Sequence, residues 1–149
     1  MQKKPLEPPI VLFTCLAAMP LCHFLLPLGR WTDFPWSWLG VIPLAAGMVL
    51  NLAADKRFQN AETTVKPQGA PSALITSGPF RISRHPMYLG MTLLLLGAAV
   101  LFGTVSPLII TAAFPMVMEI RFMGMEEKKM AAVFGTEWDA YRRKVRRWI

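Results

Sequence analysis

The chain has little material for crosslinks or metal sites. Its 149 residues include only two cysteines and two histidines. Cys15 and Cys22 lie seven residues apart in one apolar run, so on a helix they share a face but sit about two turns apart, too far for a disulfide. The sequence also lacks the Cys and His spacings typical of a metal site. We interpret both cysteines as apolar packing residues and predict no metal.

Charge is absent from long stretches of the chain. These uncharged runs cover residues 8–29, 34–54, 87–105 and 106–118. Each of the first two is long enough to cross a hydrocarbon core of about 30 Å at about 1.5 Å per residue. At 54% hydrophobic residues, the composition is too apolar for an ordinary soluble domain. We predict an all-α polytopic membrane protein, one domain over 1–149, with about four transmembrane helices near residues 8–29, 34–54, 87–104 and 106–120.

Local signals separate the last two runs. Gly103 and Thr104 can turn the chain, and Ser106-Pro107 fits an N-cap followed by proline at the first helical position. A cleavable signal peptide is the alternative for the first run, with Lys3 and Lys4 as its charged region. We favour a retained helix, because the run is long for such a peptide and no clear small-x-small cleavage site follows. We interpret His23, inside this run, as a hydrogen-bonded core residue.

Acidic residues are scarce, nine against sixteen basic ones, for a net charge of +7. The basic residues cluster at the edges of the apolar runs, which indicates membrane topology and not nucleic-acid binding. Only Arg30 falls on the opposite side from the others. The positive-inside rule then places both termini, a loop over 55–86 and a tail over 121–149 in the cytosol.

The loop and the tail carry the remaining structural signals. Residues 55–86 form an unusually long connection, and long loops tend to be functional or disordered. In the tail, Phe134-Gly135 predicts a helix stop. Beyond it, four apolar residues at spacings of 3, 4 and 3 predict an interfacial helix lying on anionic lipid. They are Trp138, Tyr141, Val145 and Trp148.

Ionisable groups stand at the mouth of the third run. Arg84, His85 and Tyr88 precede or begin it, where polar groups are unfavourable unless they are used. Pro86 suits the first turn of a helix, whose free N–H groups and partial positive charge can hold an anion. The simpler alternatives are a membrane anchor for the arginine, a helix cap for the histidine and an interfacial ring for the tyrosine.

Two sequence blocks together resemble a known superfamily. One is Arg84-His85-Pro86-Met87-Tyr88 at the head of a membrane helix, and the other is Glu126-Glu127 followed by Phe134-Gly135. With Thr63-Thr64-Val65-Lys66-Pro67 before them and Val145-Arg146-Arg147-Trp148 after them, they span about residues 55–149. This combination resembles the isoprenylcysteine carboxyl methyltransferase and phospholipid methyltransferase superfamily of small membrane enzymes. The Glu pair alone could simply form ion pairs on a solvated helix face, for example with Lys129.

The resemblance implies a methyltransferase that uses S-adenosyl-L-methionine at a cytosolic site. Candidate catalytic residues are Arg84, His85 and Arg121. In family members, the positions of Leu74, Ile75, Phe80, His85, Pro86, Met87, Tyr88 and Glu126 contact the cofactor. We predict Gly90 and Glu127 as further cofactor-binding residues. A carboxylate such as Glu126 suits the sulfonium and ammonium groups of this cofactor, and an aromatic wall suits its adenine.

The methyl acceptor stays open between a carboxylate, an amine and a thiol on a lipophilic or small molecule. Family members that methylate isoprenylcysteine carry an arginine four residues before the first Glu, where this chain has Phe122. Arg121 is one residue earlier, rotated by about 100° on a regular helix. This difference argues against isoprenylcysteine as the acceptor.

Two other classes of function compete with a methyltransferase. A membrane reductase with a nicotinamide cofactor needs no Gly-rich dinucleotide turn, so the lack of one does not exclude it. A transport or scaffold subunit would place polar residues near the bilayer midplane, where the spans offer little besides His23.

Overall fold

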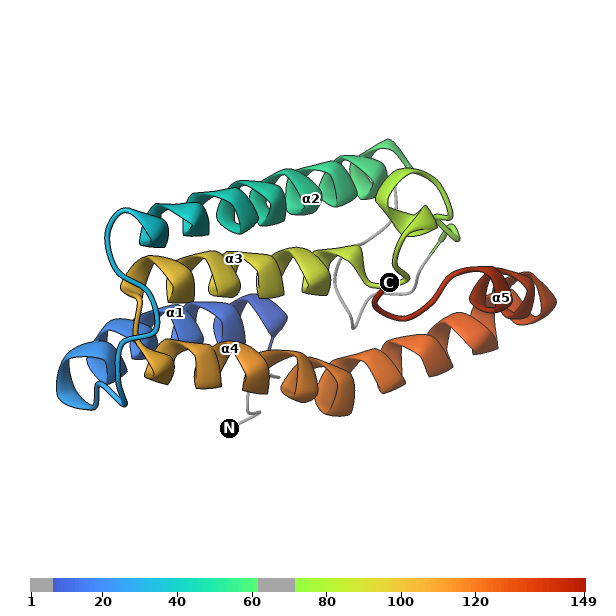
Figure 1. The fold of residues 1–149 in the computed structure, drawn as a ribbon. Coiled ribbons are helices and arrows are strands. Elements are labelled where there is room, and N and C mark those ends of the chain that lie inside the picture. The colour runs from blue at the N-terminus through green and yellow to red at the C-terminus, as the bar shows by residue number, and fades with distance from the viewer. Residues whose placement is uncertain (1–6, 62–71) are drawn as a thin grey trace.

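The computed structural model describes residues 7–61 and 72–149, and these residues form helices and links without a β-strand. Four apolar helices run side by side as a bundle (Figure 1). The elements in chain order are α1 (Pro8–Leu25), the 3-10 turn η1 (Trp36–Gly40), α2 (Val41–Asn60), the 3-10 turn η2 (Gly78–Arg81), α3 (Pro86–Phe102), α4 (Val105–Met118), the π-turn η3 (Glu119–Met123) and α5 (Gly124–Lys144).

The predicted all-α membrane architecture is confirmed. The helices Pro8–Leu25, Trp36–Asn60 and Val105–Lys144 are long and apolar enough to cross a membrane, and α3 is a shorter apolar helix of 17 residues. At 40 residues, Val105–Lys144 is about twice as long as a hydrocarbon core of about 30 Å requires. The spanning part therefore lies in the apolar first part, α4 and the turn that follows it, and most of the charged α5 lies beyond it.

Helix ends differ from the sequence prediction at two places. α1 ends at Leu25, four residues before the uncharged run does. α4 begins at Val105 with Thr104 as its N-cap, so the prediction that Ser106 caps this helix was wrong. The Ser106 hydroxyl donates instead to the carbonyl oxygen of Leu26.

These contacts belong to a set that joins the two links at one end of the bundle. The amide of Val105 donates to the Gly29 carbonyl at 3.0 Å, and the amide of Trp31 donates to the Gly103 carbonyl at 3.0 Å. His23 Nδ1 lies 2.9 Å from the Thr104 hydroxyl, which confirms a hydrogen-bonded histidine. This end is therefore closed by polar contacts, and Figure 1 shows α5 and the C terminus at the other end.

Paired glycines bring α2 and α3 into close contact. Gly40, the last residue of η1 before α2, meets Gly97, and Gly47 in α2 meets Gly90. The seven-residue spacing on the two antiparallel segments therefore matches. A Cβ atom at Gly97 would lie 2.6 Å from the Gly40 carbonyl oxygen, and one at Gly90 would lie 2.9 Å from that of Gly47. Small residues allow helix backbones to approach closely in membranes. Gly90, expected at the cofactor site, therefore faces α2 and serves packing.

The hydrophobic core lies where α1, α3, α4 and the π-turn meet. Its buried members are Leu12, Met19, Tyr88, Met91, Leu95, Ala99, Phe114, Met118, Phe122 and Met123. Tyr88 and Phe122 belong both to this core and to the wall of the polar cluster described below. The core therefore fixes one side of that cluster.

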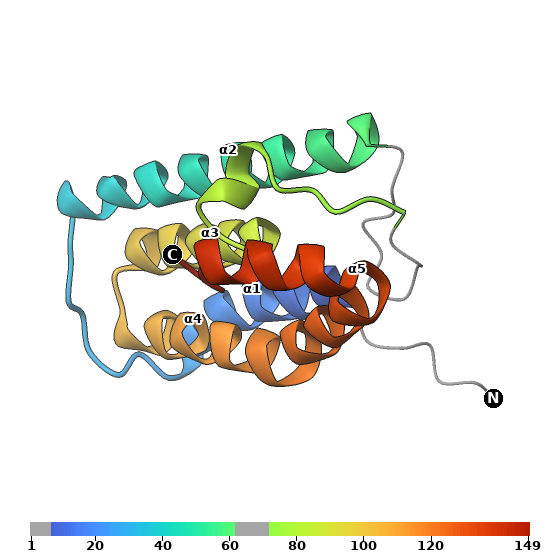
Figure 2. The same cartoon turned by 90° about the vertical axis from the view of Figure 1, so that its right-hand side faces the viewer.

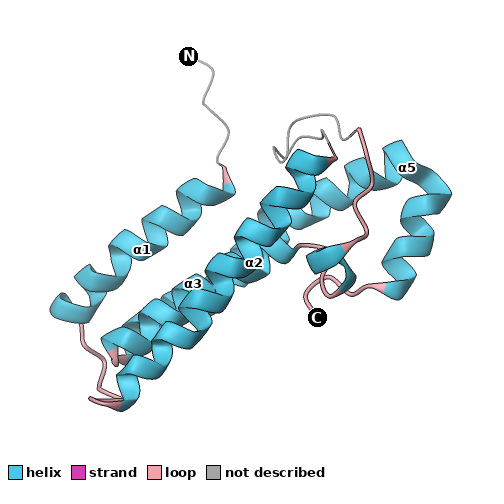
Figure 3. Cartoon of the chain, turned by 90° about the horizontal axis from the view of Figure 1, so that it is seen from above, coloured by secondary structure: helices cyan, strands magenta, loops and turns pink. Residues whose placement is uncertain are grey.

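The long last helix reverses direction at Gly135. This glycine has φ 50° and ψ −119°, a conformation that residues with a Cβ atom rarely adopt. Residues 136–144 turn back and lie across the head of α3, with the C terminus beside it (Figure 2, Figure 3). The predicted stop at Phe134-Gly135 is confirmed as a sharp bend.

The interfacial face expected beyond this bend packs against protein. Trp138 and Tyr141 are only 3% and 7% exposed, and the Tyr141 hydroxyl donates to the Phe80 carbonyl at 2.7 Å. The helix ends at Lys144, so Val145 and Trp148 follow it in a non-helical segment. The prediction that these four residues share one lipid-facing helix face was wrong.

The bend at Gly135 gives a first prediction. Gly135→Ala should destabilise the protein by about 1–3 kcal/mol, because alanine strains this backbone conformation. Gly124→Ala is the matched control, since Gly124 begins the same α5 with open space around it; it should be neutral or stabilising by up to about 1 kcal/mol. Thermal unfolding in detergent measures both, and equal midpoints for the two variants would contradict the assigned strain.

Candidate functional site

Charged and polar side chains from three segments meet at the head of α3. Arg84 and His85 precede this helix and Tyr88 lies in its first turn; Glu119, Glu126 and Glu127 come from the last helix; Arg147 comes from the segment after α5. We call this group the polar cluster. It lies at the end of the bundle opposite the two closed links (Figure 1).

His85 lies between the two adjacent carboxylates. Its Nδ1 is 3.3 Å from Oε2 of Glu126, and its Nε2 is 3.3 Å from Oε1 of Glu127. The Tyr88 ring stacks on the imidazole, with centroids 5.6 Å apart, and its hydroxyl donates to Oε1 of Glu126. Residues 85 and 88 fall on one face of the first helical turn, so the start of α3 presents both groups to the Glu pair.

The two glutamates have unequal partners. Glu127 receives two bonds from the forked guanidinium of Arg147, from Nε at 3.0 Å and from Nη2 at 2.6 Å. Nη1 of Arg84 is 3.3 Å away from the same carboxylate. Glu126 contacts Tyr88 and His85 but neither of these arginines among the hydrogen bonds and ion pairs of the described residues. Glu127 is thus the more fully engaged carboxylate.

The π-turn η3 brings Glu119 to the same side. Glu119 and Glu127 are eight residues apart, which would separate them by about 80° on a regular α-helix. A π-turn accommodates one extra residue, so the offset becomes that of seven residues, about 20°. Both carboxylates can then reach one guanidinium, and Nη1 of Arg147 donates to Oε1 of Glu119.

The cluster shifts the protonation of its members. Burial alone would lower the pKa of His85, but its hydrogen bonds to Glu126 and Glu127 raise this pKa above the usual 6.5. Burial alone would raise the pKa of Glu127, but bonds from His85 and Arg147 and the charge of Arg84 lower it to about 2. Both shifts favour the charged form of the group concerned, the imidazolium of His85 and the carboxylate of Glu127.

Two buried N–H groups, one in the cluster and one next to it, lack hydrogen-bond acceptors within the described structure. The Arg84 guanidinium carbon lies 5.8 Å from the Trp138 ring centroid. Nε of Arg84 and Nε1 of Trp138 are both buried, and neither has a hydrogen-bond partner within the described structure. Buried donors without partners are rare and destabilising, so they mark a place where an acceptor group is expected.

The other expected site residues are placed as follows. Phe80 is buried, packs edge-to-face on Phe58 with centroids 5.4 Å apart, and supports Tyr141 through its carbonyl. Pro86 is buried at the start of α3 and Met87 is half-buried beside it. Leu74 and Ile75, between residue 72 and η2, are also half-buried. The Thr63–Pro67 block lies outside the described residues.

Two expected residues are not in the polar cluster. Gly90 faces α2, as described above. Arg121 is exposed, whereas its neighbour Phe122 is buried and faces Tyr88 with ring centroids 6.4 Å apart. The structure supplies guanidinium groups from Arg84 and Arg147 instead.

The sequence prediction missed Ser83, Glu119, Trp138 and Arg147 as members or supports of the cluster. Ser83 is fully buried; its hydroxyl donates to the Arg147 carbonyl at 2.9 Å and accepts from the His85 amide at 3.1 Å. The available signal was the Arg146-Arg147-Trp148 end of the family-like pattern, which had no assigned role.

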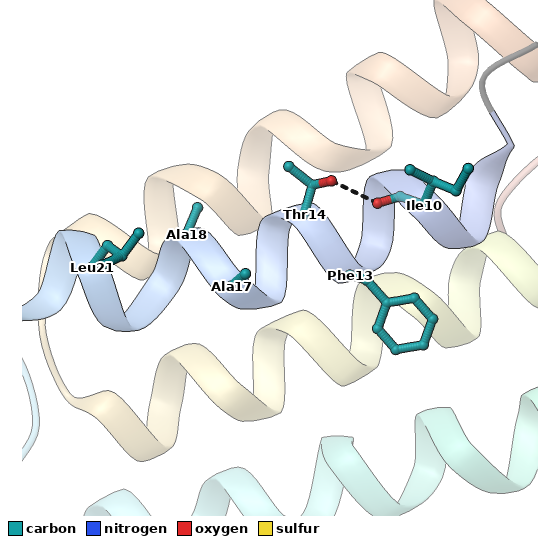
Figure 4. Close-up of a pocket in the computed structure, with 6 residues that line it drawn as sticks. All are labelled: Ile10, Phe13, Thr14, Ala17, Ala18 and Leu21. Carbon is teal, nitrogen blue, oxygen red and sulfur yellow. Dashed lines mark hydrogen bonds between the residues drawn. The ribbon is translucent and has the colours of Figure 1, made fainter. Parts of the chain in front are cut away.

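A separate surface hollow of about 600 Å³ lies on α1. All of its lining residues come from this one helix and follow helical spacing (Figure 4): Ile10, Phe13, Thr14, Ala17, Ala18 and Leu21. It belongs to the outer, apolar face of α1, and no member of the polar cluster lines it.

Among the described residues, no group of three His, Cys, Asp or Glu side chains is arranged to bind a metal ion.

Comparison with known structures establishes a shared fold. The structure is similar to that of the eukaryotic intramembrane Ras methyltransferase isoprenylcysteine carboxyl methyltransferase, solved without a monobody. The TM-score is 0.68 at 20% sequence identity, and the match covers 95% of this chain and 51% of that one. The two proteins therefore share a fold, and this chain spans about half the length of its structural relative.

The family follows from the sequence. The profile of the phospholipid methyltransferase family matches residues 36–137, which include His85, Tyr88 and the Glu pair. The chain belongs to this family, and the predicted superfamily is confirmed. No curated protein matches the chain.

The position of His85 gives a second prediction. Its folded-state pKa is raised, so protonation stabilises the fold; this contribution is present below pH of about 6.5 and is lost as the pH rises through the folded value. Glu127→Gln should lower the pKa of His85, because it removes one carboxylate partner. NMR of labelled histidine measures the pKa of His85 in the wild type and in the variant. His23, in α1, is the internal reference, and an unchanged His85 titration in the variant would contradict the assigned pairing.

Proposed function

We propose that the protein is an integral membrane methyltransferase that uses S-adenosyl-L-methionine and works at the polar cluster. The observation that carries this proposal is the pair of carboxylates flanking His85 at the head of α3. This arrangement lies in the part of the chain that matches the phospholipid methyltransferase family. Fold similarity to a Ras methyltransferase supports the same class.

The residues of the cluster fit the chemistry of this cofactor. Its sulfonium and ammonium groups are cations and suit a carboxylate. Of the two adjacent glutamates, Glu126 has fewer charged partners in the cluster. Its carboxylate is an acceptor group, and Nε of Arg84 and Nε1 of Trp138 are buried donors that lack one. Tyr88 and Phe80 offer aromatic surface for the adenine. We propose that Leu74, Ile75, Pro86 and Met87 line the same site.

When bound, the cofactor supplies a methyl group activated by its sulfonium for in-line transfer to a nucleophile. The protein's own contribution is positioning and charge placement in a site shielded from water. Glu126 holds cationic charge, Tyr88 fixes Glu126 by hydrogen bonding, and His85 orients both glutamates. Such an enzyme needs no covalent intermediate.

We propose a lipophilic or small acceptor with a carboxylate, amine or thiol, entering from the bilayer. Buried Phe122 stands where the isoprenylcysteine enzymes have an arginine, and Arg121 is exposed. Arg84 is the guanidinium closest to the Glu pair on the α3 side, at 3.3 Å from Glu127, so we assign it, with His85, to orientation of the reactants. The charge distribution favours a cytosolic site and cytosolic termini.

A binding experiment tests this function. Calorimetric titration of the detergent-solubilised protein with S-adenosylmethionine should show binding, and Glu126→Gln should weaken it by about tenfold or more, as loss of a charge-assisted contact does. Arg143→Ala is the control, because Arg143 lies in α5 and is exposed. Absence of binding, or binding of NADPH in its place, would reject the proposal in favour of a scaffold or a reductase.

The acceptor requires a separate measurement. Incubation with cofactor carrying an isotopically labelled methyl group, followed by mass spectrometry of membrane lipids and small molecules, should show one labelled product class. Loss of that product in Glu126→Gln, with the Arg143→Ala control unaffected, would connect the transfer to the polar cluster.

A further inference from the structure

The unequal surroundings of the two glutamates point to a role for Arg147. We propose that Arg147 is a positioning residue: it holds Glu127, and through Glu127 it fixes the imidazole of His85, which leaves Glu126 for the cationic part of the cofactor. This inference rests on the proposed function for its consequence in cofactor binding, whereas the positioning itself can be tested without any ligand.

Three nitrogens of Arg147 are engaged. Nε and Nη2 form a fork on Glu127, and Nη1 contacts Glu119 across the π-turn. Only the planar guanidinium of arginine presents donors in this arrangement; lysine would supply a single point charge. The geometry therefore requires arginine and not positive charge alone.

The main chain around Arg147 is held as firmly as its side chain. The segment after Lys144 leaves the helix in an extended conformation at Val145. The Arg84 amide donates to the Arg146 carbonyl at 3.0 Å. One hydroxyl, that of Ser83, joins the Arg147 carbonyl to the His85 amide. His85 and Arg147 are thus connected twice, through Ser83 at the backbone and through Glu127 at the side chains.

The exposure of these side chains indicates that Arg147 mainly orients Glu127 and adds little to the stability of the protein. The side chain of Arg147 is 33% exposed and that of Glu119 is 44% exposed. Ion pairs at this exposure contribute little to global stability. The side chains of Glu127 and His85 are nearly buried, at 14% and 8% exposed. Arg147 therefore orients two side chains that have little contact with water.

The first test compares three variants in the intact, detergent-solubilised protein. Calorimetry with S-adenosylmethionine and S-adenosylhomocysteine should show about tenfold weaker binding for Arg147→Ala, the scale of one weakened charge-assisted contact. Arg147→Lys should fall between Arg147→Ala and the wild type. Arg143→Ala, an exposed arginine of the same region, should match the wild type. Thermal unfolding of each variant establishes that it is folded.

The second test asks whether Arg147 acts through Glu127. In the Glu127→Gln background, adding Arg147→Ala should cause no further loss of binding, because the residue it holds has already been neutralised. Losses that add in full would overturn the proposal. So would an Arg147→Ala variant that binds as tightly as Arg143→Ala does.

The third test needs no ligand. With ¹⁵N-labelled histidine, the Nε2 resonance of His85 should move in Arg147→Ala and, to a smaller extent, in Arg147→Lys. It should move more than the resonance of Nδ1, which faces Glu126. His23 is the only other histidine and serves as reference. If the wild type binds no S-adenosylmethionine, the proposed function fails but this NMR shift still decides the positioning role. An unchanged Nε2 resonance overturns the role whatever the activity.

Discussion

The arrangement at the head of α3 depends on mutual neutralisation of charge at the membrane end of a helix. Three carboxylates, two guanidinium groups and one imidazole meet there. Those that are nearly buried, His85, Glu127 and Arg84, would be unfavourable without partners of opposite charge. The imidazole is central, because both of its nitrogens face carboxylates. This requirement explains why three segments distant in sequence, the head of α3, the start of α5 and the segment after it, converge on one point.

The packing of the helices holds the surroundings of the polar cluster in place. The glycine pairs of α2 and α3 hold these helices at close range along their length, while Tyr88 and Phe122 connect the core to the polar cluster. From the other side, the reversed part of α5 places Trp138 and Tyr141 over Arg84 and Phe80. The cluster is consequently enclosed between a rigid helix pair and a helix that bends back on itself.

Much of this fold could be predicted from the sequence, because uncharged runs of membrane-spanning length have few other solutions. His85 and Tyr88 were also identified, since ionisable groups at the start of a membrane span are unfavourable unless they are used. The Glu pair was identified through the family resemblance. The bend at Gly135 was predicted as a stop, but its direction was not, because an amphipathic face indicates burial without specifying its partner. For that reason Trp138 and Tyr141 were assigned to lipid.

The role of Arg147 could not be predicted, since it depends on helical phase. On a regular helix, Glu119 and Glu127 would point in directions about 80° apart. The residue types do not predict the π-turn that brings the two side chains to the same side. The same change of phase affects the choice between Arg121 and Phe122, for which a regular helix was assumed. Pattern reasoning therefore worked within helices and failed at the turn that joins two of them.

The reversal at Gly135 also has a consequence for the order in which the protein is made. The ribosome completes all four apolar helices before it reaches Arg147, which must then return to the level of Ser83. The polar cluster can therefore be completed only after every described apolar helix has been synthesised. A chain interrupted anywhere after α4 but before Arg147 would contain every apolar helix and still lack a completed cluster.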